Sequence, residues 1–425
     1  MVPKGDGVYV QRRWVAVAVA ATVLLVPAYL VTKAGEGDPT ATAPASTATS
    51  TTSAVRVGPS SGPSSVTPAT GSVLASSTTA VPTRSAPSAQ TRLVRLMRLT
   101  GNLSAKSVDA SHGLVFAQNM MYQHSISVFA ADGRLLRTIP DTVDLAALGI
   151  PGHPGLSRGA PVEMAYSPDG RTAWVSNYSM YGAGFLPEGR DACTGPAGTS
   201  RSFLYRIDTS TYAITAAVEV GYVPKYVAVT PDGRSVLVTN WCSMDLDVVD
   251  AASNRVSATI PVTGPHPRGI AVTADSRTAY VAVMGAGKVV RVDLRTRKVT
   301  DFARTGDGPR HVVLSPDGHT LYVTNNGSGT VSAVDAATGR VLRDAVMGRQ
   351  PRSMAISPDG TALYVVNYSS SSVSKVRTSD LTVTQTVPVD GLPIGITYEQ
   401  TRRAVWVSCY SGVIDVFDDS RLAAS

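Results

Sequence analysis

PRHVVLSPDGHTLYVTNNGSGTVSAVDAATGRVLRDAVMGRQ, which runs from Pro309 to Gln350, reads as four short strands joined by turns. HVVLS is a continuous apolar run, as expected of a strand that is buried on both faces. HTLYVTN and TVSAVD are rich in residues that favour strands, and RVLRDAV forms the fourth. The SPDG, NGSG and DAATG segments supply the Pro, Asp and Gly that tight turns use. The stretch therefore predicts one four-stranded antiparallel sheet.

The same unit recurs along the chain at a nearly constant interval. Prolines open five copies at steps of 43, 42, 42 and 42 residues: Pro224, Pro267, Pro309, Pro351 and Pro393. An earlier copy opens at Pro161, and a degenerate first copy covers Lys106 to Asn119. A period of about 40 residues with four strands is typical of propeller blades. Because one blade cannot bury its faces alone, the seven copies predict an all-β, seven-bladed β-propeller of four-stranded blades.

The last copy, which opens at Pro393, supplies only three strands. The missing strand lies at the other end of the domain, where RLVRLMRLTG from Arg92 precedes the first copy as VLRDAVMG precedes the sixth. We therefore expect the N-terminal strand to close the ring, which removes the open sheet edges that favour aggregation. The propeller should span residues 91–419, followed by a short tail at 420–425.

One tetrad in the repeat carries a family resemblance. Tyr322 to Asn325 spells YVTN, and its variants are VTN at 238–240, YVVN at 364–367 and WVSN at 174–177. With SPDG before the tetrad and VDAATG after it, residues 92–418 resemble the YVTN-repeat (YncE-like) seven-bladed β-propellers. The resemblance implies the propeller fold. It implies no single function, because that family mixes surface and binding proteins with relatives of lactonases and quinoproteins.

Three segments precede the propeller. Residues 1–13 are polar and basic, and residues 14–31 form a nearly unbroken apolar run close to the lower length limit of a membrane span. The basic flank predicts a cytoplasmic N-terminus and a single-pass plasma-membrane protein with an extracytoplasmic propeller. The alternative is a cleaved signal peptide and a secreted protein. Residues 35–90, rich in Ser, Thr, Ala and Pro, predict a disordered linker.

Two insertions interrupt the regular spacing of the copies. One spans Asp141–Ala160, and the other follows Asn177 and runs to Ser200. The first insertion lies directly before the first strand of its copy, and the second insertion lies directly after the second strand of the same copy. Because strand direction alternates, both insertions lie on one face of the ring. Loops carry function more often than the strands that hold them. This face is therefore the candidate working face.

The chain holds three cysteines. Cys193 lies in the second insertion and Cys242 lies in the matching loop of the next blade, so we expect a Cys193–Cys242 disulfide in an exported, oxidising setting. Cys409 replaces the tetrad Asn of the last blade and is expected to be buried and free. No CxxC or neighbouring His pattern is present, so we predict neither a zinc site nor another cofactor.

Four consecutive copies carry a basic residue directly after the opening proline: Lys225, Arg268, Arg310 and Arg352. Repeat geometry places these residues at equivalent positions around the mouth of the central channel. Like charges repel one another unless anions or carboxylates neutralise them, which predicts an anion-binding mouth for a carboxylate, a phosphate or an acidic glycan. The alternative is that each side chain bonds backbone carbonyls of a neighbouring blade. The net charge of +7 indicates no more than solubility.

Aromatic side chains gather in the loops after the second strands, among them Tyr178, Tyr181 and Trp241. Beside a basic mouth such rings can stack on a sugar or a base. The alternative is that they cover the gaps between blades.

His311 aligns with Glu163 in the repeat, and both are expected near the same mouth. With Arg310 as oxyanion partner, they would act as acid and base in an enzyme of the lactonase or lyase type. No second carboxylate and no serine elbow accompanies them in the copies. Catalysis is therefore the alternative to binding rather than the first hypothesis.

We thus predict a monomeric binding or interaction module, more readily than an enzyme, that needs no cofactor. Its partner would be a cell-envelope glycan, an anionic small molecule or a protein, and no motif supports a nucleic acid. The alternatives are a lactonase- or lyase-like propeller enzyme and a ligand-free cell-envelope scaffold.

Overall fold

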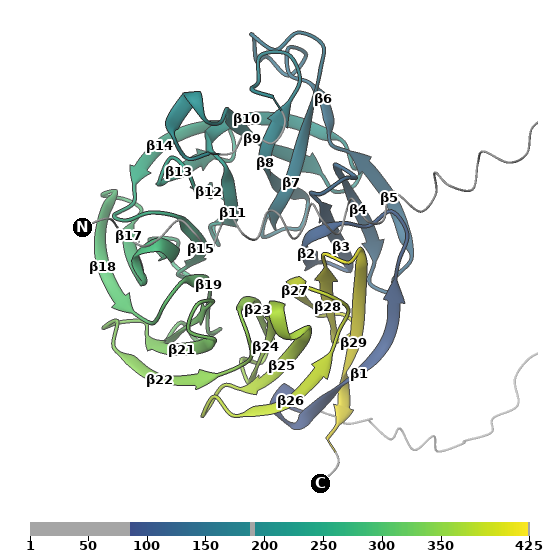
Figure 1. Ribbon diagram of the computed structural model, residues 1–425, viewed down its shortest axis with the longest axis vertical. Coiled ribbons are helices and arrows are strands. Elements are labelled where there is room, and N and C mark those ends of the chain that lie inside the picture. The colour runs from purple at the N-terminus through teal and green to yellow at the C-terminus, as the bar shows by residue number, and fades with distance from the viewer. Residues whose placement is uncertain (1–85, 188–191, 424–425) are drawn as a thin grey trace, which may run out of the picture. The chain divides into compact units, whose positions relative to one another are not determined.

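The computed structural model describes residues 86–187 and 192–423, which belong to one compact unit. They form seven antiparallel sheets arranged as the blades of a ring, which confirms the predicted seven-bladed propeller (Figure 1). The predicted N-terminal segment, membrane span and linker lie outside the described residues, apart from the last five residues of the linker. Within the described ranges, no helix is long and apolar enough to cross a membrane.

In each blade the first long strand lies nearest the centre of the ring and the last lies at the rim (Figure 1). Blade 1 consists of β2 (Ala105–Ser111), β3 (Leu114–Asn119), β4 (Ser125–Ala130) and β5 (Leu135–Pro140). Blade 2 consists of β6 (Thr142–Asp144), β7 (Leu156–Tyr166), β8 (Thr172–Tyr181), β9 (Arg201–Asp208) and β10 (Ile214–Tyr222). Blade 3 consists of β11 (Pro224–Val229), β12 (Ser235–Asn240), β13 (Asp245–Asp250) and β14 (Arg255–Pro261). Blade 4 consists of β15 (Pro267–Val272), β16 (Thr278–Val283), β17 (Lys288–Asp293) and β18 (Lys298–Arg304).

The remaining blades follow the same order. Blade 5 consists of β19 (Pro309–Leu314), β20 (Thr320–Asn325), β21 (Thr330–Asp335) and β22 (Val341–Val346). Blade 6 consists of β23 (Pro351–Ile356), β24 (Ala362–Asn367), β25 (Ser372–Arg377) and β26 (Val383–Pro388). Blade 7 consists of β27 (Pro393–Glu399), β28 (Ala404–Cys409), β29 (Val413–Leu422) and β1 (Thr91–Leu99). Four short 3-10 helices are η1 (Ser88–Gln90), η2 (Gly195–Ala197), η3 (Met284–Ala286) and η4 (Tyr368–Ser370).

The N-terminal strand β1 completes blade 7 by pairing antiparallel with β29, as the sequence predicts. A buried set of side chains, which we call the closure clasp, holds the end of β1 in place. Lys375 Nζ donates to the carbonyl oxygen of Thr91 at 2.7 Å and forms an ion pair with Asp419. The Tyr364 hydroxyl donates to the same carboxylate. The side chains of Lys375 and Asp419 are both fully buried, so the clasp is sealed from solvent.

The hydrophobic core lies between neighbouring blades rather than in one central layer. One cluster joins Leu237 and Leu246 of blade 3 to Ile270 and Val281 of blade 4, all of which are buried. Each blade therefore buries both of its faces only when a blade stands on either side. This is why the ring must close, and why burial of apolar surface, the main stabilising effect, depends on β1.

The Asn that ends the YVTN tetrad ties two strands of a blade together. Asn325 Nδ2 donates to Thr330 Oγ1 at 3.0 Å and to Ser332 Oγ at 2.8 Å, which joins the second strand to the third. The same pair of bonds recurs in blades 1 and 6. Cys409 takes this place in blade 7, where it is buried and outside any disulfide, as predicted. The tetrad is thus a structural signature and not part of a site.

Blade 2 departs from the four-stranded pattern, because the first insertion adds the short strand β6 to it. β6 pairs with the extended start of β7, and that part of β7 pairs with the extended end of β8. The two insertions meet there, and side chains such as Leu145 and Met180 form a small core. We call the described residues of 141–160 and 178–200 the lobe. Cys193 and Cys242 form the predicted disulfide, with Cα atoms 4.7 Å apart, and tie the lobe to blade 3.

Candidate functional site

The basic quartet, which comprises Lys225, Arg268, Arg310 and Arg352, occupies one equivalent position in four consecutive blades. Each residue is the second of an innermost strand: β11, β15, β19 or β23. In each of these strands the pairing register shifts directly after the opening proline. A bulge of this kind re-aims the side chain that it contains. The repeat therefore brings four cations to the same end of four neighbouring inner strands.

Trp241 lies between two members of the basic quartet. Its ring centroid is 5.5 Å from Lys225 Nζ and 5.6 Å from Arg268 Cζ. The indole also stacks on His266, with ring centroids 4.2 Å apart. The ring of Tyr178, from blade 2, lies 3.6 Å from Lys225 Nζ. Aromatic faces attract cations without neutralising them, so these rings help to position the charges of Lys225 and Arg268.

The other aromatic residues divide between the quartet and the lobe. Tyr368 lies against Arg352, with 3.3 Å from the guanidinium carbon to the ring centroid, and it packs edge-on against Tyr410. Tyr181 was predicted to lie with Tyr178 beside the quartet. Its ring contacts Arg158 in the lobe instead, at 5.5 Å from the centroid. Because β8 continues past the end of its blade, Tyr181 is carried away from the inner strands.

Arg310 is the member of the basic quartet that most needs a bound anion to pair with its charge. Its side chain is buried, with 8% of the residue exposed. Within residues 86–187 and 192–423, no hydrogen bond and no ion pair reaches its guanidinium. Burial lowers the pKa of Arg310 well below its ordinary value, and the charges of Arg268 and Arg352 lower it further. The predicted alternative, in which each basic side chain bonds backbone carbonyls of a neighbouring blade, is therefore wrong for Arg310.

His311, the next residue along β19, is held in place by both ring nitrogens. Nδ1 accepts the Met354 N–H at 3.0 Å, so in the neutral ring Nε2 carries the proton, and it lies 2.6 Å from the Tyr226 hydroxyl. This bond joins blades 5 and 3 across Gly269 of blade 4, where a Cβ would come within 2.8 Å of His311 Cα. Burial lowers the pKa of His311 to about 3, and Arg268 adds to the shift. The imidazole is thus neutral near pH 7.

Glu163 and His311 have different partners, so the structure does not join the predicted acid–base pair. The Glu163 carboxylate forms a buried ion pair with Lys106 of blade 1. Burial lowers the pKa of Lys106 to about 8, although Glu163 raises it. Asp109, on the same strand as Lys106, has its pKa raised well above the usual range by burial and by Glu163. These three residues form an ionic cluster on the inner strands of blades 1 and 2.

Sequence reasoning missed Lys106 and Asp109, although a signal for each is present. Lys106 occupies the quartet position of the first copy, but Ala105 replaces the proline that marks the other copies. Asp109 stands where the six other copies carry Ala, Val or Thr. Aligning all seven inner strands without requiring the proline would have selected both residues.

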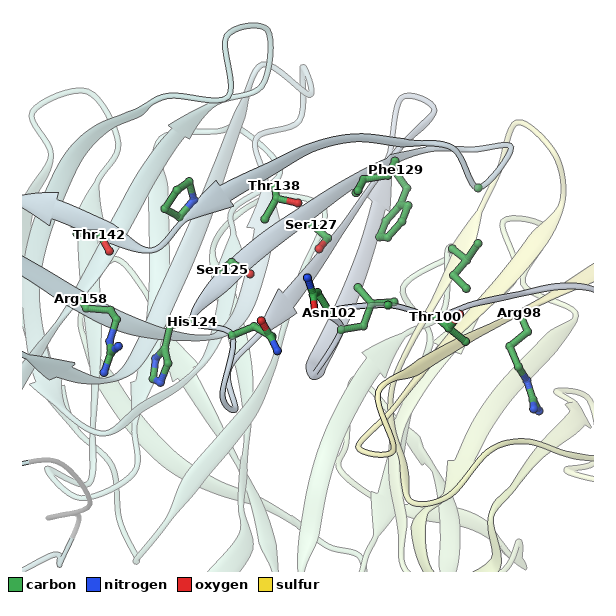
Figure 2. A pocket seen from close by; sticks show the side chains of 17 residues that line it. Arg98, Thr100, Asn102, His124, Ser125, Ser127, Phe129, Thr138, Thr142 and Arg158 are labelled. Carbon is green, nitrogen blue, oxygen red and sulfur yellow. The ribbon is translucent and has the colours of Figure 1, made fainter. Parts of the chain in front are cut away.

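A groove of 650 Å³ lies away from the quartet, between the rim of blade 7 and blade 1 (Figure 2). Phe129 and Arg98 line it, and Figure 2 shows His124 and Arg158 together at one end. No member of the basic quartet contributes to its walls. Arg98 already donates to Asp415 at 3.1 Å. Polar side chains such as Thr100 and Ser125 share the walls of the groove with apolar ones such as Phe129. Because the groove lies away from the basic quartet, we place the candidate site at the quartet.

The fold and the site together define a seven-bladed β-propeller with a cationic and aromatic site on its inner strands. Residues 157–344, less than half of the chain, match the model of a family described as "Lactonase, 7-bladed beta-propeller". The matched segment contains three members of the quartet, together with Glu163 and His311. The matched segment does not include Arg352 or the strands β1 and β29, which close the ring.

The structural comparison supports the fold. A chain of "Kuenenia stuttgartiensis Hydrazine Synthase" superimposes with a TM-score of 0.60 at 16% sequence identity, covering 76% of this chain and 98% of that chain. At this level of identity the similarity shows a shared fold alone. No curated protein matches the sequence.

Proposed function

We propose that the protein is an extracytoplasmic binding module that holds a small organic anion at the basic quartet. The observation that carries the proposal is Arg310, which is buried, lies close to two other guanidinium groups, and forms no hydrogen bond or ion pair within the described residues. A buried charge is tolerated when it is paired. A carboxylate or phosphate presents two oxygens to the planar fork of an arginine and forms stronger bonds than a neutral acceptor does.

The rings beside the quartet favour an anion that carries a flat or ring-shaped body. Trp241 and Tyr410 offer apolar faces next to the charges, as sites that bind sugars often do. An acidic sugar from the cell envelope combines both features. The resemblance to YVTN-repeat propellers, which include surface and binding proteins, supports the same role.

The disulfide of the lobe supports an oxidising, extracytoplasmic setting. The apolar run at residues 14–31 would tether the propeller to the plasma membrane. Protease treatment of intact cells tests this part of the proposal: cleavage within the predicted linker, residues 35–90, should release the propeller from the cells while a cytoplasmic control protein survives. Retention of the propeller by the treated cells would contradict it.

Binding is tested by calorimetry on the full chain with glucuronate, a sugar phosphate and uncharged glucose. The acidic ligands should bind and glucose should not. Arg310→Ala should weaken binding about 10- to 150-fold, which corresponds to the roughly 1.5–3 kcal/mol of a charged hydrogen bond. Arg343→Ala, which removes an exposed arginine from the rim strand β22, is the matched control and should bind as the wild type does. Equal affinities for the two variants would refute the site, and no binding of any acidic ligand to the wild type would refute the function.

A second candidate function is the hydrolysis of an anionic lactone, which the match to the lactonase family model favours. Water would attack the lactone carbonyl carbon while the ring C–O bond breaks, and Arg310 would stabilise the oxyanion. Since His311 has both ring nitrogens engaged, the water-activating role would fall to Glu163. A pH-stat assay with a panel of acidic lactones tests this: Glu163→Gln should abolish acid release while ligand binding persists. The absence of turnover by the wild type would reject it.

A further inference from the structure

The positive charge of the protein is concentrated in one blade. Between Pro267 and Arg304, blade 4 carries eight Lys and Arg residues against three Asp residues, which gives a net charge of +5. The same count gives −1 for blade 3, from Pro224 to Pro261, and zero for blade 5, from Pro309 to Val346. The charge of this single blade thus approaches the +7 of the whole chain.

Five of these cations form a cluster at one end of blade 4, which we call the rim patch. Its members are exposed and belong to the β15–β16 turn, to β17, or to the turn that leads into β18: Arg277, Arg291, Arg295, Arg297 and Lys298. The two turns touch, because the Leu294 N–H donates to the Arg277 carbonyl oxygen at 2.9 Å. The strand β18 lies at the rim of the ring (Figure 1).

The acidic residues of blade 4 leave most of the charge of the rim patch unbalanced. Asp293 accepts the Thr296 N–H at 2.7 Å, and Asp275 accepts the Arg277 N–H at 3.1 Å, so each carboxylate is held in its own turn. The third aspartate pairs with Lys288 instead. Within residues 86–187 and 192–423, none of the five cationic side chains forms an ion pair. Five cations beside two aspartates leave the rim patch with a charge of +3.

The surroundings of the rim patch indicate what kind of partner it fits. None of the exposed large hydrophobic side chains of the described chain belongs to blade 4, whereas protein interfaces depend on apolar and aromatic anchors. The nearby rings are not free to stack on a base, because Tyr280 is buried and Phe302 lies half-buried under Arg291. A single exposed ion pair is weak. Affinity therefore requires several anionic groups on one polymer that bind together.

A flat anionic membrane fits this face less well than a polymer strand does. The turns of the rim patch follow the first and third strands of blade 4, so they share a face of the ring with the corresponding turns of the other blades. Those turns carry exposed aspartates, among them Asp132, Asp169, Asp232 and Asp317. A lipid surface would meet these like charges together with the rim patch, whereas a single strand contacts blade 4 alone.

We propose that the rim patch binds an anionic glycan of the cell envelope, a linear polymer that carries a carboxylate or a phosphate in each repeat. The envelope as its source rests on the extracytoplasmic setting of the proposed function. The site itself is separate from the basic quartet, because Arg268 stands at the start of β15 and Arg277 follows its end. The two binding surfaces thus lie at opposite ends of the same strand.

Fluorescence anisotropy of the full chain with a dye-labelled glucuronate polymer and a dye-labelled poly(glycerol phosphate) tests the proposal. At least one polymer should bind, and its affinity should fall at least about tenfold between about 50 and 200 mM salt, because binding releases counterions. Arg295→Ser/Arg297→Asn/Lys298→Ser should weaken binding at low salt by at least about tenfold, since three exposed pairs are lost. Asparagine is chosen at position 297 because Arg297 has a φ of 61°, which Asn tolerates.

The matched control is Arg134→Ser/Arg171→Ser/Arg234→Ser, which removes the same charge from exposed turns of blades 1 to 3 on the same face and should bind the polymer as the wild type does. The rim-patch variant should still bind monomeric glucuronate, which separates this test from that of the quartet. Equal weakening by the two triple variants would mean that only net charge matters and would overturn the proposal. It would also be overturned if neither polymer bound, or if duplex DNA or phosphatidylglycerol vesicles bound more tightly than both polymers.

Discussion

The closure clasp makes a quantitative prediction about how the ring is held together. Lys375 and Asp419 are fully buried, and Lys375 Nζ also bonds the carbonyl and hydroxyl oxygens of Thr91 on β1. Lys375→Met keeps most of the side-chain volume but leaves the carboxylate of Asp419 without its cation. The hydroxyls of Thr91 and Tyr364 still donate to Asp419, but they carry no charge. A buried carboxylate solvated by two hydroxyl groups is much less stable than one paired with an ammonium.

Removing one partner of a buried ion pair destabilises a protein by about 3–5 kcal/mol. For a domain of this size, we expect Lys375→Met to lower the Tm by roughly 5–10 °C. Urea denaturation of the full chain, followed by tryptophan fluorescence, measures the free energy of unfolding directly. The double variant Lys375→Met/Asp419→Asn should recover at least half of the loss, because it removes the uncompensated charge.

An ion pair with one exposed partner supplies the control for the clasp. Lys288 Nζ lies 2.5 Å from Asp301; the side chain of Lys288 is 12% exposed and that of Asp301 is 58% exposed. Lys288→Met should change the free energy of unfolding by less than about 1 kcal/mol, because solvent screens such pairs. If Lys375→Met also loses less than about 1 kcal/mol, the reasoning that the clasp holds β1 in the ring is refuted.

Three further predictions concern the lobe and the inner strands. Cys193→Ser should speed proteolysis of the lobe while the ring stays resistant. The reason is that a disulfide between residues 49 apart contributes about 4 kcal/mol in the chain-entropy model. Unchanged cleavage would mean that the small core of the lobe is enough to keep the lobe folded. The folded pKa of His311, about 3, lies below its unfolded value, so the stability that neutral His311 confers above about pH 6.5 is lost as the pH falls toward 3. His311→Gln should therefore flatten the acid side of the stability curve, and parallel curves of urea midpoint against pH for the two proteins would contradict this. Gly269→Ala places a methyl group 2.8 Å from His311 Cα and should lower the free energy of unfolding by about 1–3 kcal/mol. An unchanged urea midpoint would argue against so close a packing of β15 and β19.

The parts of the structure that repeat could be predicted from the sequence. The strand and turn pattern around Pro309 is local, so seven copies predicted seven blades, and counting strands predicted the closure by β1. The Cys193–Cys242 disulfide followed from placing two loops at matching positions on adjacent blades. Each of these inferences needs only the period of the repeat and the alternation of strand direction.

Details of the site that break the repeat could not be predicted in the same way. The bond between His311 and Tyr226 spans two blades because Gly269 has no side chain in between, and no pattern within one copy encodes such a contact. Glu163 was aligned with His311 correctly, but its partner, Lys106, belongs to a copy without the marker proline. Tyr181 lies in the lobe because β8 is longer than the second strands of the other blades.

The position of the closure clasp has a mechanical consequence. The chain enters the propeller through η1 and β1, so a pull along the preceding residues loads the bonds of Ser88 and Ala89 to blade 6 and then reaches Thr91. That residue is the one whose carbonyl and hydroxyl oxygens bond Lys375 inside the protein. A force along the chain would therefore load a sealed ionic contact before it could peel the exposed outer strand. A buried ionic contact thus lies close to the place where a tether would pull on the ring.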